Sequence, residues 1–323
     1  MKKIITILPI LWVLTACTPD TKSAENSNSS NSTKTVETAV DTSANVAEKT
    51  TSEVAAKTET TPSKEVSPTK EKSENKPPKV SENTPPKAEE GGGKRAASLF
   101  DRFHTSQILV VKAANEKAIQ GTLCLYEWDA TKKVWNPKSG NLSVTLGRTG
   151  MAWAKGLQPQ PWNVGTLKKE GDGKAPEGIF EISSLFGYKE KAKLSFSPKM
   201  PYTHSKSSFV CVDDVNSSHY NQILDSEGVT SDWKSKEDML RKDNLYELGA
   251  VVAYNTQNVA KGEGSCVFLH IWRGADKPTA GCTAMTEANA KSIFSQLDAS
   301  KKPLLIQLTE ENYGKYKNVL QFP

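Results

Sequence analysis

A histidine and a cysteine stand on opposite sides of one short loop, in the segment His270-Ile-Trp-Arg-Gly-Ala-Asp-Lys-Pro-Thr-Ala-Gly-Cys282. A cysteine with an unperturbed pKa of about 8.5 is mostly protonated at neutral pH, and only its thiolate is strongly nucleophilic. An imidazole beside the thiol, or a positive backbone dipole, can help to remove that proton. The segment therefore contains the two side chains that a cysteine nucleophile and its general base require.

The residues around this loop predict the elements that hold the two side chains. The unbroken apolar run 267–271 predicts a buried strand that delivers His270 at its end. Downstream, Thr286 is a candidate N-cap, and apolar residues recur after it at helical spacing. This pattern predicts a helix over residues 286–297.

Cys282 is then expected in a tight turn that leads into this helix, where Gly281 allows the chain to bend. The backbone amides of Gly281 and Cys282 are candidates for an oxyanion hole, because they can point at a developing negative charge. The alternative is that Cys282 is a small buried apolar residue, which is the commonest role of a lone cysteine.

Other kinds of site do not fit the spacings. The histidines show no paired metal-ligand spacing and the cysteines contain no CxxC pair, so we expect no metal and no cofactor. A zinc site made by His270 and Cys282 is the alternative. A Walker A phosphate loop ending at Gly173-Lys174 would need glycine at position 168 and Ser or Thr at 175, where the chain has Lys168 and Ala175.

Two motifs in the same order resemble the L,D-transpeptidase (YkuD-type) catalytic domain family. In that family a histidine precedes a Ser/Thr-x-Gly-Cys turn, here Thr279 to Cys282, and one branch carries a GDGKxPEG segment upstream, here residues 171–178. The similarity continues through Gly147–Gly150, Val212–Asp214, Tyr220-Asn221 and Tyr254-Asn255, so it covers the chain from about residue 104 to the C-terminus. Ala280 and Ala284 stand where many members carry His and Arg, and no substrate-binding role is carried over to them.

The resemblance implies a reaction on peptidoglycan stem peptides. His270 would take the proton of Cys282, and the thiolate would attack the carbonyl after the third stem residue, expelling D-alanine and leaving a thioacyl enzyme. An amine of a second stem peptide or of another acceptor would then give a 3-3 cross-link, an exchanged amino acid or an attached protein.

Two alternatives to this reaction remain open. Water as the acceptor would make the same site an L,D-carboxypeptidase or endopeptidase. A lipoprotein that only binds the cell wall is the non-enzymatic alternative, and the joint presence of His270 and Cys282 favours the enzyme.

Three further residues are candidates for substrate binding. Arg273 could bind a carboxylate and Trp272 could pack against the peptide, since both follow the strand that carries His270. Tyr220 is a weaker candidate. The alternative for Arg273 is a solvated turn charge, and for Trp272 it is a core aromatic.

The N-terminus has the parts of an export signal: a basic start at Met1-Lys-Lys, an apolar run from Ile4 to Val13, and small residues after it. Leu14-Thr-Ala-Cys17 resembles the lipobox of bacterial lipoproteins, which implies a signal peptide over residues 1–16 and lipidation of Cys17. A plain secretory peptide is the alternative. Because Thr18 is not the aspartate that retains some lipoproteins at the inner membrane, we expect an outer-membrane anchor facing the periplasm in a diderm host.

The composition changes sharply over residues 17–97, where Ser, Thr, Lys, Glu and Pro dominate and no aromatic residue occurs. Such a segment cannot bury a core, and it is expected to be a disordered tether ending near Gly91–Gly93. Residues 98–323 then form one catalytic domain, which we expect to be monomeric. The net charge of +5 is too small to imply a nucleic-acid partner.

The domain is predicted to be mainly β, a curved antiparallel β-sandwich or open barrel of the L,D-transpeptidase type with a few short helices. The expected strands cover residues 107–111, 121–126, 249–254 and 303–308, and a second helix is expected over 235–240. If Cys17 is lipidated and Cys282 is a free thiol, the remaining cysteines allow at most one disulfide. The spacing does not select the pair among Cys124, Cys211 and Cys266.

Overall fold

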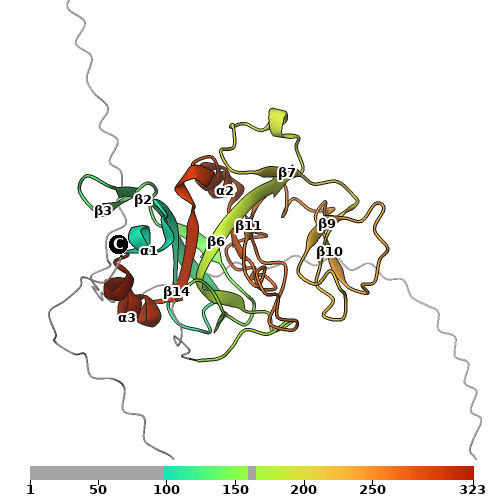
Figure 1. The fold of residues 1–323 in the computed structure, drawn as a ribbon, viewed down its shortest axis with the longest axis horizontal. Coiled ribbons are helices and arrows are strands. Elements are labelled where there is room, and N and C mark those ends of the chain that lie inside the picture. Colours follow the sequence, from blue (N-terminus) through green and yellow to red (C-terminus); the bar gives the residue numbers. More distant parts are fainter. Residues whose placement is uncertain (1–97, 159–164) are drawn as a thin grey trace, which may run out of the picture. The chain divides into compact units, whose positions relative to one another are not determined.

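The computed structural model describes residues 98–158 and 165–323, and these residues are built mainly from β-strands (Figure 1). The expected export signal, the lipidation site Cys17 and the expected tether over residues 17–97 lie outside the described residues. No helix in the described part of the chain is long and apolar enough to cross a membrane.

The large sheet contains the strands that were expected from the sequence and several shorter ones. Its strands are β1 (Gln107–Ala113), β2 (Gln120–Asp129), β3 (Val134–Pro137), β4 (Leu142–Thr145), β5 (Met151–Trp153), β6 (Ala175–Gly187), β7 (Tyr202–His204), β11 (Leu248–Val252), β12 (Phe268–Ile271), β13 (Thr283–Met285) and β14 (Leu304–Thr309). A second, small sheet is made by β8 (Phe209–Val212), β9 (Ile223–Asp225) and β10 (Lys236–Asp238).

The order of the main path of the large sheet is β1-β14-β6-β11-β12-β13-β4-β2-β3, and an additional pairing joins β1 to β2. This pairing joins β1, at one end of the order, to β2, the strand next to the other end, so the sheet curls into a partly closed barrel. Most neighbours are antiparallel, while β1–β14, β12–β13, β5–β6 and β6–β7 are parallel. The predicted mainly β fold class is confirmed.

Apolar side chains cover both faces of this sheet, because successive residues of a strand point to opposite sides. In β1, Leu109 and Val111 belong to a core cluster that also contains residues of α2 (Glu287–Phe294). Ile108 and Val110 belong to a second cluster, which includes Leu320 of α3 (Glu310–Leu320). The remaining helical elements are short: α1 (Leu99–Phe103), η1 (Lys191–Lys193) and η2 (Ala299–Lys301).

The helix expected after the cysteine turn is present as α2. Thr286 is its N-cap, and the Thr286 hydroxyl accepts a hydrogen bond from the Asn289 N–H at 3.1 Å. The buried residues of α2 are those whose helical spacing predicted it: Ala290, Ile293 and Phe294. The prediction is therefore confirmed, with the helix ending at Phe294.

The helix expected over residues 235–240 is wrong. The segment is extended as β10, and Glu237 pairs with Cys211 of β8. Six residues are too few to form a stable helix without packing support, and here β8 offers backbone hydrogen-bond partners instead. Tertiary pairing has overridden the local preference of a Lys-Glu-Asp-Met sequence.

A buried carboxylate fixes the start of α3. Glu177, only 3% exposed, accepts hydrogen bonds on one oxygen from the Thr309 N–H at 2.8 Å, the Thr309 hydroxyl at 3.0 Å and the Asn312 amide at 2.7 Å. The free N–H groups and the dipole at a helix N-terminus favour a negative charge there. The glutamate of the GDGKxPEG segment thus joins β6 to the last helix.

One disulfide of the described residues joins Cys211 to Cys266, the pair that the spacing could not select. It connects β8 of the small sheet to the residue shortly before β12. Cys282 is a free thiol.

Candidate active site

His270 and Cys282 lie on the same face of neighbouring strands. In the parallel pair β12–β13, His270 lies beside Ala284, so Cys282, two residues earlier in the chain, lies beside Phe268. Side chains alternate along a strand, so His270 points to the same side as Phe268 and Cys282. The hydrogen bond from the Phe268 N–H to Cys282 Sγ, at 3.4 Å, agrees with this arrangement.

The turn that contains Cys282 does not lead directly into a helix, as was expected from the sequence. It leads into β13, whose three buried residues pair with β12 and whose Ala284 also pairs with β4, before Thr286 begins α2. The backbone groups of this buried stretch need partners, and the two flanking strands supply them. The strand pairing therefore fixes the position of Cys282 relative to His270.

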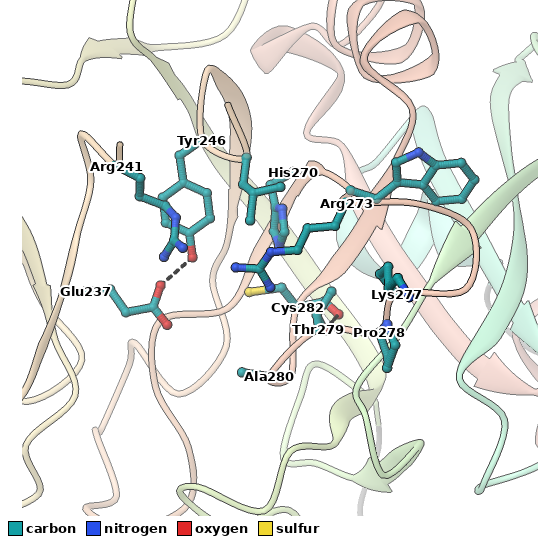
Figure 2. A pocket seen from close by; sticks show the side chains of 12 residues that line it. Glu237, Arg241, Tyr246, His270, Arg273, Lys277, Pro278, Thr279, Ala280 and Cys282 are labelled. Carbon is teal, nitrogen blue, oxygen red and sulfur yellow. Dashed lines mark hydrogen bonds between the residues drawn. The ribbon is translucent and has the colours of Figure 1, made fainter. Parts of the chain in front are cut away.

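The two side chains border one pocket of about 100 Å³ (Figure 2). Trp272 and Arg273, two of the residues expected to bind substrate, also line it. The remaining lining residues come from the segments 237–246 and 277–280: Glu237, Arg241, Leu245, Tyr246, Lys277, Pro278, Thr279 and Ala280. Tyr220, the third expected substrate-binding residue, is not among them and is only 2% exposed.

The Cys282 thiol is buried and protonated in the resting site. Besides the Phe268 N–H, it meets the Cys266 carbonyl oxygen, to which the thiol donates at 3.6 Å. Burial, together with the negative charge of Glu237, raises the pKa of Cys282 to about 12. The hydrogen bond from the Phe268 amide and the positive charge of Lys168 favour the thiolate and oppose these effects on the pKa.

His270 is buried as a neutral imidazole. Its Nδ1 lies 2.8 Å from the Ile271 carbonyl oxygen, which can only accept, so Nδ1 carries the proton and Nε2 is left as the basic nitrogen. The edge of the ring packs against Tyr246, with ring centroids 5.2 Å apart. Burial, together with the nearby charges of Arg241 and Arg273, lowers the pKa of His270 to about 4.

Hydrogen bonds within the turn hold Cys282 and distinguish the two candidate oxyanion donors. The Thr279 hydroxyl donates to the Cys282 carbonyl at 2.6 Å and accepts from the Gly281 N–H at 3.1 Å. The Gly281 amide is therefore already engaged, whereas the Cys282 N–H has no acceptor among the described residues. The Cys282 amide is the better placed of the two to bind a developing oxyanion.

The wall facing the thiol comes from the small sheet and the segment after it. The Tyr246 hydroxyl donates to Glu237 Oε2 (Figure 2). The guanidinium of Arg241 stacks 5.1 Å from the Tyr246 ring centroid and forms two hydrogen bonds of 2.9 Å with Asp243. Within the described residues, no group of three His, Cys, Asp or Glu side chains is arranged to hold a metal ion.

Comparison with known proteins decides the family. The model of the L,D-transpeptidase catalytic domain, YkuD, matches residues 140–306, which include His270, Cys282 and the wall that faces them. The chain belongs to the L,D-transpeptidase family. No curated protein and no solved structure matches it. L,D-transpeptidases of this family act on peptidoglycan peptides.

In this L,D-transpeptidase domain the GDGKxPEG segment packs against the turn that contains Cys282. Asp172 pairs with the buried Lys168 at 2.6 Å and accepts the Lys174 N–H at 2.9 Å. The Lys174 carbonyl then lies so close to Gly281 that a Cβ there would stand 3.1 Å from it. Gly281 is in the positive-φ region, at +153°, so this position needs glycine both for conformation and for space.

Tyr220 lies away from the pocket, where it contacts Glu170, just before the GDGKxPEG segment, and the loop before β12. Its hydroxyl donates to Glu170 at 2.5 Å and accepts the Gly264 N–H at 3.1 Å, while Ser265 donates to the same Glu170 oxygen at 2.7 Å. Burial, with the Glu170 hydrogen bond and charge, raises the pKa of Tyr220 well above its usual value. Its aromatic side chain is therefore part of the packing that orders the loop before β12.

The sequence analysis missed the residues of the opposite wall. Glu237, Arg241 and Tyr246 belong to no motif, and Glu237 lies in the segment that was expected to be a helix. The only local signal was the density of charged residues between 234 and 243, which also suits an exposed loop.

Proposed function

We propose that this chain is a cell-envelope L,D-transpeptidase in which Cys282 is the nucleophile and His270 Nε2 is its general base. The observation that carries the proposal is the pocket that both side chains border, with Nδ1 of the histidine held by a carbonyl oxygen. Fixing Nδ1 as the donor leaves Nε2 free to accept the thiol proton.

In the first half of the reaction, Nε2 takes the thiol proton as sulfur attacks the carbonyl after the third stem residue. The negative charge moves to the carbonyl oxygen, where the Cys282 N–H and, once released from Thr279, the Gly281 N–H can donate to it. The tetrahedral intermediate then collapses, and the amine of D-alanine leaves with the proton from His270. A thioester on Cys282 remains.

The pKa values favour a neutral pair in the resting site. Burial keeps the thiol protonated and the imidazole uncharged, so no standing thiolate–imidazolium pair is expected before substrate binds. Proton transfer would then accompany the attack on the carbonyl. Such a pair is protected from reactions of a free thiolate while the site is empty.

The second half of the reaction is aminolysis of the thioester, which forms the new amide and returns the proton to sulfur. The products are a 3-3 cross-link, an exchanged amino acid or an attached protein. If water replaces the amine, the product is the free tripeptide and the enzyme is an L,D-carboxypeptidase or endopeptidase. A cell-wall-binding lipoprotein without activity is opposed by the intact pair of Cys282 and His270.

We also propose that the enzyme is anchored by lipid at Cys17 and acts from the outer membrane into the periplasm. The lipobox-like Leu14-Thr-Ala-Cys17 supports the anchor, and Thr18 supports the outer membrane. Cys17→Ser should leave an unprocessed precursor, which gel mobility and labelling with a fatty acid would detect. Mature wild-type protein that stays soluble without detergent would contradict the anchor.

The test of the nucleophile is Cys282→Ser, assayed with a synthetic stem tetrapeptide that ends in D-alanine. Wild type should release D-alanine and form a thioacyl enzyme that mass spectrometry detects, whereas the serine variant should do neither, because its hydroxyl is far less ionised than a thiol. A carbapenem should add its mass to the wild type only. Turnover by the serine variant near the wild-type rate would show that Cys282 is not the nucleophile.

A further inference from the structure

Four charged side chains line the pocket, and they differ in whether they have an ion-pair partner. Three are cations, and each already lies beside an acidic side chain, although two of them share one carboxylate. Arg241 forms two 2.9 Å hydrogen bonds with Asp243, Arg273 lies 3.7 Å from the same carboxylate, and Lys277 lies 3.1 Å from Asp276. Neither Asp243 nor Asp276 lines the pocket.

Glu237 is the one carboxylate among the lining residues, and no Lys, Arg or His of the described chain lies within ion-pair distance of it. Its Oε2 accepts the Tyr246 hydroxyl, while Oε1 has no hydrogen-bond partner among the described residues. Burial raises the pKa of Glu237 and the negative charges of Asp213 and Glu170 add to the rise, while the Tyr246 hydrogen bond and the positive charge of Arg241 oppose it. One oxygen of Asp213 is itself buried without a hydrogen-bond partner among the described residues.

This arrangement hinders the first half of the proposed reaction. The charge of Glu237 raises the pKa of the thiol that must lose its proton to attack the donor. A partly buried carboxylate without a cation is also unfavourable by itself. Both costs would be offset if a cation from a substrate docks beside the thiol in the second half of the reaction.

We propose that Glu237 binds the ammonium group of the acyl acceptor and takes its proton before the amine attacks the thioester on Cys282. The proposal rests on the proposed function and assigns the acceptor side of the pocket. Figure 2 shows the Glu237 carboxylate and the Cys282 sulfur on the same opening, and both line the same cavity of about 100 Å³. That volume suits a few heavy atoms, such as an aminomethyl group, since liquid water occupies about 30 Å³ per molecule.

The balance of the step is simple. The acceptor ammonium gives one proton to Glu237, and the neutral amine attacks the thioester carbonyl, forming the C–N bond. The C–S bond then breaks, and a second nitrogen proton passes through His270 Nε2 to sulfur, which restores the thiol. Glu237 finally releases its proton to solvent.

A second base is needed because His270 is a poor acceptor for an ammonium proton. Burial lowers the pKa of His270 to about 4, far below that of an alkylammonium group. Leaving water raises the pKa of a carboxyl group and lowers that of an ammonium, so proton transfer between the two becomes easier inside the pocket. Donor acylation needs only the thiol proton, which His270 can take, and therefore does not require Glu237.

The test compares the full-length wild type with Glu237→Gln, using a stem tetrapeptide ending in D-alanine as donor and D-methionine as the amine. D-alanine release reports acylation, and the ratio of exchanged tetrapeptide to free tripeptide reports how the thioester partitions between amine and water. Glutamine keeps the size of the side chain and an oxygen for the Tyr246 hydroxyl. Glu247→Gln is the matched control, because Glu247 pairs with Lys189 at 3.0 Å and neither residue lines the pocket.

We expect Glu237→Gln to lower the ratio of exchange to hydrolysis by about tenfold at subsaturating amine, the effect of losing one charge-assisted hydrogen bond. Its acylation rate should equal or exceed that of the wild type, because the thiol loses a negative neighbour. Glu247→Gln should match the wild type in both measurements.

Slower acylation by Glu237→Gln with an unchanged ratio would mean that Glu237 binds the donor, and the proposal would be wrong. It would be wrong too if Tyr246→Phe reproduced the whole change in ratio, since Glu237 would then act only by orienting the tyrosine. Absence of D-alanine release from the wild type itself would refute the proposed function and, with it, this inference.

Discussion

The buried His270 should make the stability of the domain sensitive to mild acid. Burial lowers the pKa of His270 from 6.5 to about 4. Between pH 6.5 and pH 4, the imidazole is therefore protonated in the unfolded chain and neutral in the folded chain. The contribution of His270 to the free energy of unfolding is therefore fully present above pH 6.5 and falls as the pH drops toward 4. Below pH 4 this group causes no further loss. Since one pKa unit is worth about 1.4 kcal/mol, the loss between pH 7 and pH 4 is about 3 kcal/mol.

Urea unfolding of the wild type and of His270→Asn at several pH values between 7 and 4 measures this effect. Asparagine does not titrate, so the variant should start less stable at pH 7 and then lose about 3 kcal/mol less than the wild type. His104→Asn is the matched control: His104 is exposed, and its left-handed backbone, with φ of 53°, suits asparagine. Equal losses in wild type and His270→Asn would refute the assignment of a buried neutral imidazole.

Two further substitutions test the supports of the site. Glu177→Gln should lower the free energy of unfolding by about 1–3 kcal/mol in urea, because the start of α3 loses its buried negative charge, while Glu181→Gln, exposed on the same strand, should change it by less than about 0.5 kcal/mol. Equal effects would contradict the role of Glu177. Gly281→Ala should slow D-alanine release about 10- to 100-fold by displacing the cysteine turn from Lys174. Gly314→Ala, in open space on α3, should leave that rate unchanged, and a Gly281→Ala rate near wild type would show that the turn tolerates a side chain.

Local patterns were enough to predict the elements on either side of the cysteine turn. The apolar run at 267–271 became β12, and the cap at Thr286 with its helical spacing became α2, because in both cases burial and local preference agree. The helix predicted over 235–240 was wrong because the conformation of this segment depends on pairing with β8, which lies far away in the sequence. The short strand β13 was missed for the same reason, since three residues carry too little pattern to compete with the turn before them and the helix after them.

The site residues that could be predicted were also those marked by local sequence features. His270 and Cys282 could be found because their order and the glycine before the cysteine are motif features, and the strand pairing places them on one face. Trp272 and Arg273 reached the pocket because they directly follow β12. Tyr220 did not, since an aromatic residue in a polar loop can serve packing as well as binding, and its hydroxyl is committed to Glu170.

The opposite wall depends on contacts between distant segments, and the disulfide is the main one. Cys211 pairs with Glu237 across β8 and β10, and its sulfur is bonded to Cys266, whose carbonyl accepts the Cys282 thiol. A short path of one strand pairing, one covalent bond and one hydrogen bond thus links the carboxylate to the nucleophile. Because each of these contacts joins residues far apart in the sequence, no local motif could predict them. The same path fixes the small sheet against the strand that carries His270, which is the condition for Glu237 to act on anything bound at the thiol.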